Sequence, residues 1–375
     1  MGLKEAKIVV DSTQTPVRRD TVEYIKSYQY HNDTLAQANF EEGRARYQKQ
    51  YQQNGDSIYS YVDDFFLKDH LGNTRVILTT QKDTAKYDAT MEAATRATEN
   101  ALFYNIDSVS YPTSLVPNQF PGDPASPNDS VAMVSGSTHP VGPAIILKVM
   151  TGDSISMGVN SYFVGTGPAG NTTSSIPNLL STLADGLVAL GGGGGHGTLS
   201  NLDNTNGSPI YTALTSFLPS YDSTPGQKPK AYLNWMLLDN QFNYVSGSGQ
   251  SGAIAVGTAG TEATLATAFK LRHSGYLYIW VSNETQNWDV FFDNLSIQHF
   301  SGPMLEENHY YPFGLGMAGT SDKALMADYA ENRYRYNGKE LQHQEFSDGT
   351  GLEEYGIGGA MSGFTIVQYY FTGKN

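Results

Sequence analysis

Cysteine is absent from the 375 residues of this sequence. Its absence excludes disulfide bonds, thiolate zinc sites and cysteine nucleophiles, and it leaves the cellular compartment open. Basic residues are also scarce: 23 Lys and Arg stand against 37 Asp and Glu, which gives a net charge of −14. Nucleic-acid binding requires a basic stripe, so the composition predicts no nucleic-acid partner and disfavours anionic membrane surfaces.

Long apolar runs are missing as well. No window approaches the roughly 18 apolar residues of a membrane-spanning helix. The first residues, MGLKEAKIVVDSTQ, lack the apolar core of a secretory signal peptide. We therefore expect neither a membrane-spanning segment nor a signal peptide in this chain, and its abrupt start favours a piece of something longer.

Glycine and tyrosine are abundant, with 39 Gly and 25 Tyr, a composition that suits turn-rich β structure. In the first 90 residues, Asn54-Gly55 separates two alternating runs, which is a strong hairpin signal. Gly72-Asn73 similarly precedes the β-branched run that follows Arg75. These features predict a meander of antiparallel hairpins.

The middle of the chain has a different pattern. Residues 84–106 suit either a helix or a loop leading into a strand at 102–106, and the stretch 112–130 is rich in proline and typical of a connector. From about residue 131, Ile145, Leu147 and Val149 alternate toward one face, and TGDS at 151–154 forms a tight turn before the next such run. Further strand-like runs at 230–245, 266–285 and 289–300 predict a β-sandwich.

An insertion at 171–224 interrupts this sandwich. The runs 174–192 and 208–222 place apolar residues at helical spacing and predict a helical pair over one end of the sandwich. Between them, GGGGGHG at 191–197 lacks the Lys-Ser/Thr of a phosphate-binding loop, so we interpret it as a flexible linker.

Several strings occur in a characteristic order: FEEGRARY (40–47), KDHLGNTRV (68–76), EENHYYPFGL (306–315), YNGKELQ (336–342) and EFSDGTGLEEY (345–355). In this order they resemble the Rhs repeat-associated core of Bacteroidetes-type Rhs/YD-repeat proteins, and the passage at 274–307 is similar to that group too. The resemblance implies a fragment of a large, secreted or surface-displayed β-shell that encloses an effector or mediates cell contact. Its partners would then be the rest of the shell or its effector.

The end of the chain departs from the family pattern. After GLEEY the family continues with a Tyr-Gly-Ala-Arg stretch and an Asp-Pro-x-x-Gly-Arg signature, whereas here the sequence is GIGGAMSGFTIVQYYFTGKN. Only Gly359-Ala360 remains of that pattern. We therefore expect a chain that is truncated or altered at this end and lacks the closing segment, the self-cleavage region and any toxin.

Together these features predict an all-β fold in several parts. Residues 1–90 and 301–355 form a YD-repeat-like antiparallel hairpin sheet, and residues 91–130 connect it to a jelly-roll-like sandwich at 131–300. The helical, Gly-rich insertion 171–224 belongs to the sandwich, and 356–375 is an atypical tail. Open sheet edges favour pairing, so we also expect self-association.

Two motifs invite a catalytic interpretation. Asp69-His70 could act as a carboxylate–imidazole pair, but neighbouring strand residues point to opposite faces. In the structural interpretation Asp69 caps the turn, His70 is half-buried and Arg75 pairs across a strand. His309 to Pro312 fits the same scheme, with Pro312 ending a strand and Gly314 taking the turn. We therefore predict no catalytic residue, no cofactor and no metal.

The sandwich contains the candidate ligand-binding residues Trp235, Trp280, Trp288 and Asn283, which could form a sugar-stacking platform with a polar contact. The alternation of Tyr276 with Trp280 equally fits a stripe that packs in a core. FFDNLSI resembles the last strand of jelly-roll carbohydrate-binding modules, which makes Asp293 a candidate for structural calcium, although calcium requires six to eight oxygens.

The sequence thus supports three functional hypotheses. The first is a non-enzymatic scaffold of an Rhs-like shell, outside the cell or on its surface as part of a larger chain. The second is a carbohydrate-binding module that uses the inserted sandwich. The third is a glycosidase, which would need two facing carboxylates about 5 Å or 6.5–9.5 Å apart.

Overall fold

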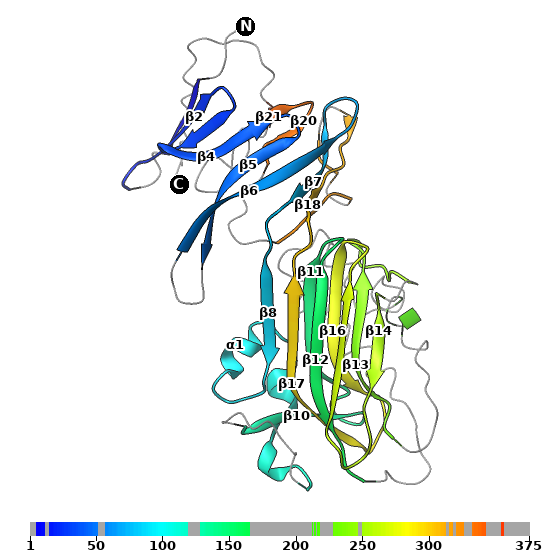
Figure 1. The fold of residues 1–375 in the computed structure, drawn as a ribbon. Helices are drawn as coiled ribbons and strands as arrows, with labels where there is room; N and C mark the ends of the chain where they lie inside the picture. The colour runs from blue at the N-terminus through cyan, green and yellow to red at the C-terminus, as the bar shows by residue number, and fades with distance from the viewer. Residues whose placement is uncertain are drawn as a thin grey trace, which may run out of the picture. The chain divides into compact units, whose positions relative to one another are not determined.

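The computed structural model describes residues 5–11, 15–51, 57–118, 128–165, 212, 214, 216–217, 228–246, 250–312, 315–317, 320–325, 332–342 and 354–355. This part of the chain consists mainly of antiparallel strands with short helical turns, which confirms the all-β prediction (Figure 1). It divides into two compact units. Unit 1 comprises 1–81, 310–316 and 326–375, and unit 2 comprises 82–309 and 317–325.

Unit 1 is a meander in which each strand pairs with the next one along the chain. Its strands are β1 (Ala6–Asp11), β2 (Arg18–Ile25), β3 (Tyr28–His31), β4 (Thr34–Phe40), β5 (Gly43–Tyr51), β6 (Ser57–Lys68) and β7 (Thr74–Thr79). A small sheet of β20 (Tyr334–Tyr336), β21 (Lys339–Gln342) and β22 (Glu354–Tyr355) completes the described strands of the unit.

Turn chemistry explains the meander. Asn32 and Asp33, between β3 and β4, take φ values of 46° and 64°, which a two-residue hairpin turn requires and which Asn and Asp tolerate. The predicted turn at Gly72 joins β6 and β7, with a φ of 83° that favours glycine. Asn54-Gly55 lies outside the described residues, but the strands on either side of it pair as predicted.

Unit 2 is a sandwich of two antiparallel sheets. One contains β8 (Thr84–Ala89), β9 (Ser110–Pro112), β10 (Ser130–Ser135), β12 (Ser154–Tyr162), β15 (Ala263–Lys270) and β17 (Asp289–Phe300). The other contains β11 (Val141–Val149), β13 (Ala231–Leu238), β14 (Gly252–Ala255) and β16 (Gly275–Asn283). The hairpin of β18 (Met304–Glu307) and β19 (Asp322–Lys323) also belongs to this unit.

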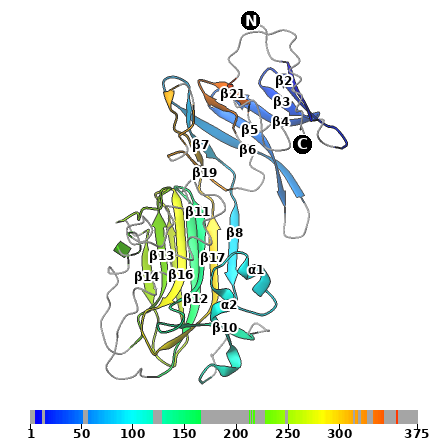
Figure 2. The same ribbon diagram turned by 180° about the vertical axis from the view of Figure 1, so that it is seen from behind.

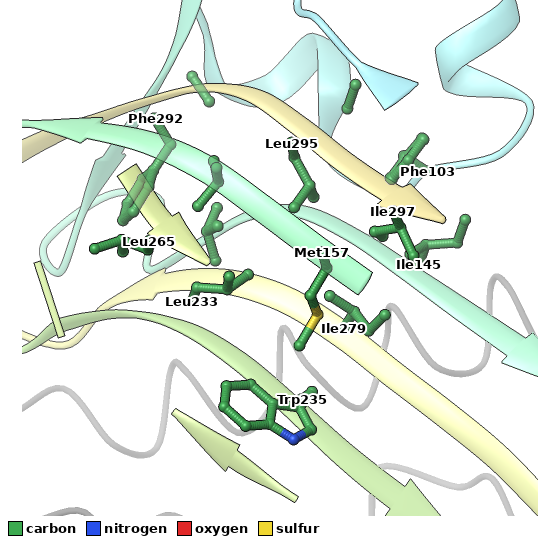
Figure 3. Close-up of a cluster of buried hydrophobic side chains, with 14 of the residues drawn as sticks. Phe103, Ile145, Met157, Leu233, Trp235, Leu265, Ile279, Phe292, Leu295 and Ile297 are labelled. Carbon is green, nitrogen blue, oxygen red and sulfur yellow. The ribbon is translucent and has the colours of Figure 1, made fainter. Parts of the chain in front are cut away.

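The two sheets enclose the main hydrophobic core (Figure 3). Ile145 and Ile279 from one sheet and Met157 and Ile297 from the other are buried in it, as their alternation along the strands requires. The TGDS turn is tight as predicted, with Gly152 at a φ of 97°. It joins β11 to β12, which lie in different sheets, so it connects the two layers of the sandwich.

The segment after β7 differs from the sequence prediction. Residues 84–89, expected in the hairpin sheet, form β8, which pairs with β17 of the sandwich. The short helices α1 (Arg96–Asn100) and α2 (Ile106–Val109) follow (Figure 2). Helix α2 leads directly into β9. A three-residue 3₁₀ turn, Thr113–Leu115, comes next. Local propensity could not assign β8, because its partner lies about 200 residues further along the chain.

The insertion is described at only four positions. Thr212, Leu214, Ser216 and Phe217 are helical, in agreement with the second predicted helix, and the rest of 171–224 lies outside the described residues. Leu214 and Phe217 are fully buried against the outer face of the sheet that contains β16. No helix among the described residues has the length and apolar character that crossing a lipid bilayer requires.

Candidate functional site

The KDHLGNTRV string forms a turn that is organised around one carboxylate. Asp69 Oδ1 accepts hydrogen bonds from the backbone N–H groups of Leu71 and Asn73, both at 3.0 Å. Asp69 Oδ2 accepts from Asn73 Nδ2 at 2.8 Å and from Arg75 Nε at 2.9 Å. Both oxygens therefore have two donors, which fills their usual capacity.

These contacts determine the charge state of Asp69. Partial burial raises the pKa of its carboxyl, but the hydrogen bonds from Asn73, Arg75 and Leu71 lower it by more and hold it well below its usual range. His70 is exposed, which corrects the prediction that it is half-buried. Asp69 thus remains an ionised turn cap with its lone pairs engaged, as the structural interpretation requires.

Two strings from the far end of the sequence pack against this turn within unit 1. The backbone N–H of Asn337 donates to Asn73 Oδ1 at 2.8 Å, and Thr74 Oγ1 donates to the carbonyl of Tyr334 at 3.0 Å. Tyr310 Oη donates to the carbonyl of Thr74 at 3.0 Å. Residues from KDHLGNTRV, EENHYYPFGL and YRYNGKELQ therefore satisfy one another's polar groups, and we call this meeting point the motif junction.

Aromatic rings surround the motif junction. The Tyr310 and Tyr336 rings meet edge to face at 5.8 Å, and the Arg75 guanidinium lies 5.4 Å from the centre of the Tyr310 ring. These geometries are typical of aromatic and cation–π contacts that contribute to packing. Pro312 follows the exposed Tyr311, and Gly314 lies outside the described residues.

A second set of contacts ties the small sheet to the meander. Tyr24 Oη donates to Glu340 Oε1 at 2.9 Å, and Gln29 Nε2 donates to Tyr334 Oη at 2.8 Å. Burial raises the pKa of both tyrosines, and the nearby Glu340 charge raises them further, so their hydroxyls stay neutral donors and acceptors. These contacts, like those of the motif junction, hold strands together.

One face of the meander contains a buried ionic cluster that sequence reasoning missed. Arg44 Nε and Arg46 Nε, both on β5, lie 3.0 Å and 2.8 Å from the same Asp64 Oδ2 on β6. All three side chains are at most 2% exposed. Gln37 and Gln81 accept further hydrogen bonds from these guanidinium groups. The Arg-Ala-Arg alternation was a signal that both charges share one face.

The opposite face of the same strands presents aromatic rings to solvent. Tyr59 and Tyr61 on β6 are 56% and 51% exposed. Tyr47 on β5 stacks on Tyr59 with ring centres 5.6 Å apart and meets Tyr61 edge-on at 5.6 Å. Lys49 lies over the Tyr59 ring at 5.9 Å. We call Tyr47, Tyr59 and Tyr61 the tyrosine face.

The four candidate ligand-binding residues of the sandwich do not form one exposed surface. Trp235 lies in the core between the sheets (Figure 3). Its ring stacks on Phe269 with ring centres 5.7 Å apart. Trp280 is fully buried on the other side of its sheet, with Phe217 edge-on at 5.6 Å. Trp288 packs against the core beside Phe163.

Asn283, the polar member of that set, has a structural environment. Its side chain is buried, and Nδ2 donates to the carbonyl groups of Val134 at 3.0 Å and Trp288 at 2.7 Å. Its Oδ1 accepts from the backbone N–H of Thr285. Sugar binding by this set stays a prediction. Trp235 and Trp280 lie on opposite faces of one sheet, and each packs in a different buried cluster.

The candidate calcium ligand Asp293 lies on β17 of the sandwich. Asp293 is buried, and its Oδ1 accepts from the N–H of Asn294 at 2.9 Å. Among the described residues, no group of three or more His, Asp or Glu side chains is arranged to hold a metal ion. The Gly-rich stretch 191–197 lies outside the described residues.

No protein-family model matches the sequence, and no curated protein matches it. Two solved structures from Clostridium thermocellum share a weak likeness. The CBM22-1–GH10 modules of the xylanase Xyn10B, complexed with xylohexaose, are 10% identical, with 52% of this chain and 25% of that chain covered and a TM-score of 0.23.

The second structure is the C-terminal family 22 carbohydrate-binding module of the same xylanase. It is 8% identical, with 64% of this chain and all of that chain covered, and its TM-score is 0.24. At these identities and TM-scores neither likeness supports an inference about what this chain binds.

Proposed function

We propose that this chain is a non-enzymatic structural scaffold, an Rhs-like β-sheet fragment that carries an inserted sandwich. The observation that supports it is the motif junction, where residues 73 and 74 form hydrogen bonds with residues 310, 334 and 337, each more than 230 positions away in the sequence. These are the strings on which the resemblance to the Rhs core rests. Their shared task is to hold together parts of unit 1 that lie on either side of a long insertion in the sequence.

The state of Asp69 argues against catalysis at this site. A general base needs a lone pair within reach of its substrate, and both Asp69 oxygens are occupied by Leu71, Asn73 and Arg75. Its pKa lies below the usual range, whereas a base that works near neutral pH needs a higher one. In this proposal the partners are the rest of an Rhs-like shell or its effector, outside the cell or on its surface.

Hydrogen exchange followed by mass spectrometry tests the scaffold proposal. In Asn73→Ala the N–H of Asn337 loses its acceptor, so exchange should accelerate in peptides that cover 332–342, far from the substitution in sequence. The matched control is His70→Ala in the same turn, because His70 is exposed and should leave these peptides unchanged. Unchanged exchange at 332–342 in Asn73→Ala would mean that the motif junction does not hold this segment in place, which would contradict the scaffold proposal.

The tyrosine face favours a second candidate function, carbohydrate binding. Exposed aromatic rings suit the C–H-rich faces of sugars, and the hydroxyls of Tyr59 and Tyr61 with the nearby Lys49 ammonium supply polar contacts. In this proposal the glycan lies on the open side of β5 and β6. The sandwich then has a structural role, since Trp235 and Trp280 are buried.

A glycan array with three single variants separates these alternatives. If the tyrosine face binds, Tyr59→Ala and Tyr61→Ala should each lose glycan signal while the hydrogen-exchange protection of β4 and β5 in unit 1 stays native. Tyr311→Ala is the control, because Tyr311 is also half-exposed but belongs to the EENHYYPFGL string. Equal signal from all three variants, or no signal from the wild type, would exclude the tyrosine face as a glycan site.

A further inference from the structure

Three polar side chains from distant parts of unit 2 converge on the outer face of the sheet formed by β11, β16, β13 and β14. Lys148 Nζ lies 2.6 Å from Asn240 Oδ1 and 2.6 Å from Asp322 Oδ1. Asn240 Nδ2 in turn donates to Asp322 Oδ2 at 3.2 Å. Each member of this lysine–asparagine–aspartate triad therefore contacts both of the others.

Strand register explains how the triad assembles. Lys148 on β11 is opposite Tyr276 on β16, and Tyr276 is opposite Leu238 on β13. Side chains directly opposite one another point to the same face, and Asn240 follows Leu238 by two residues. Asp322, on β19, completes the set.

The surroundings of the triad are apolar and aromatic. Lys148 Nζ lies 4.6 Å from the centre of the Tyr276 ring, and Phe242 stacks on that ring at 4.8 Å. The Lys148 and Asp322 side chains are only 12% and 5% exposed. Burial lowers the pKa of the Lys148 amine, although Asp322 offsets part of this effect. A buried amine of this kind is a better nucleophile than one in water, because more of it is neutral.

A plain ion pair would need only Lys148 and Asp322. Here the amine also contacts the carbonyl oxygen of a carboxamide, while the carboxylate holds the nitrogen of the same carboxamide. The nucleophile, the electrophile and a proton carrier are thus in mutual contact. We propose that Lys148 and Asn240 react to form an intramolecular isopeptide bond, with Asp322 transferring the protons.

The reaction balances without any other reagent. Lys148 first transfers a proton to Asp322, which gives a neutral amine and a neutral carboxyl. The amine nitrogen attacks Asn240 Cγ and forms a tetrahedral intermediate. Asp322 protonates the departing nitrogen of Asn240 and takes up the second amine proton as the C–N bond breaks. The products are the Lys148 Nζ–Cγ Asn240 amide and ammonia, which leaves with the last proton as ammonium and restores the Asp322 carboxylate.

The proximity of the Lys148 amine to the Asn240 carboxamide favours the reaction most. Amines do not attack carboxamides at a useful rate in water, but reactants held about 3–3.5 Å apart gain a large effective concentration. Hydrogen-bonding distance between Lys148 Nζ and Asn240 Oδ1 puts the amine close to the attacked carbon. Tyr276 and Phe242 exclude water from one side, which favours the neutral forms. The bond would link positions 92 residues apart.

Intact-mass spectrometry of the purified full chain decides the proposal. We expect the folded wild type to weigh less than its sequence by one ammonia, and a protease digest to yield one branched peptide that contains both Lys148 and Asn240. Lys148→Arg and Asn240→Ala should both restore the full sequence mass. Lys86→Arg is the control that should keep the deficit, since Lys86 forms an exposed ion pair with Asp88.

Two results would overturn it. A folded wild type at its full sequence mass, with both linear peptides present, would mean that the triad is only an ion pair with an added hydrogen bond. An ammonia deficit without a branched peptide would assign the loss to cyclisation of an asparagine on its own backbone. The wild type alone gives either answer, so the proposal stays testable even where a variant fails to fold.

Discussion

Removal of the Asp64 carboxylate should destabilise unit 1 selectively. Asp64→Ala leaves the Arg44 and Arg46 guanidinium groups buried without the carboxylate that they share, at 3.0 Å and 2.8 Å in the native chain. Breaking a buried ion pair from one side costs about 3–5 kcal/mol. Two charge-assisted hydrogen bonds at about 1.5–3 kcal/mol each give about the same total. A loss of this size is a large share of a domain's usual stability.

The chain offers an internal reference for the assay. Trp235, Trp280 and Trp288 are its only tryptophans, and all three lie in unit 2, so tryptophan fluorescence reports unit 2 alone. Unit 1 is followed by hydrogen exchange in peptides that cover β4 to β6. Since about 1.4 kcal/mol is a factor of ten in an equilibrium, we expect protection in those peptides to fall by about two to three and a half orders of magnitude. The fluorescence transition should not move.

Asp63→Ala is the matched control. Asp63 is the preceding residue on the same strand, its side chain is exposed, and its described hydrogen bonds involve only the backbone. A surface change of this kind costs at most about 0.5 kcal/mol. Equal loss of protection in Asp63→Ala and Asp64→Ala would refute the reasoning, because the cost would then come from the strand and not from the buried charges.

Three further predictions follow from unit 2. Burial, with the nearby Asp129 and Glu99 charges, raises the pKa of Glu92 to about 7 from 4.5, so the folded state holds this proton more tightly than the unfolded state. The free energy of unfolding of unit 2, measured by fluorescence, should therefore fall as pH rises from about 4.5 through 7. In Glu92→Gln this fall should be smaller, and an equal fall in the variant and the wild type would contradict the prediction. Gly275→Ala should destabilise unit 2 strongly, because Gly275 has a φ of 153° and an added Cβ would lie 2.0 Å from the Leu238 carbonyl oxygen. Gly158→Ala, in β12 of the same unit, is the control: its Cβ would lie 3.4 Å from Ala266 Cβ, an ordinary van der Waals distance, so this variant should melt close to the wild type. If the isopeptide bond forms, closing a 92-residue loop lowers the conformational entropy of the unfolded chain and stabilises the folded state by about 4.6 kcal/mol. Asn240→Ala should then melt about 9–18 °C lower than the wild type, and an unchanged melting temperature would argue against the bond.

Local signals predicted the hairpins well. The left-handed turn at Gly72 and the alternation of Ile145, Leu147 and Val149 both follow from rules that act within a few residues. Assignment of strands to sheets did not follow from such rules. The TGDS turn reads like a hairpin, yet β11 and β12 lie in different layers, because the choice of partner depends on distant strands such as β16 and β17.

The exposure of aromatic side chains could not be predicted from the sequence either. Tyr59 and Tyr61 alternate on β6 just as Tyr278 and Trp280 alternate on β16, but the first pair is half-exposed and the second fully buried. The difference lies in what covers each face: Phe217, from the insertion, packs on Trp280. A period of two shows that side chains share a face, and it is silent on whether another segment lies over that face.

The burial and the contacts of charged side chains could not be predicted from the sequence either, and they bear on function. Arg44 and Arg46 would be assigned to solvent by hydropathy, yet they are buried, where they contact the Asp64 carboxylate and glutamine side chains. Asp69 looks reactive beside His70 in the sequence, yet four donors occupy its oxygens. A carboxylate with no remaining lone pair can hold a turn but cannot accept a proton from a substrate. Asp69-His70 is therefore a structural motif. The two candidate functional surfaces are the exposed tyrosine face of unit 1 and the triad of unit 2, where the Lys148 amine contacts the Asn240 carboxamide.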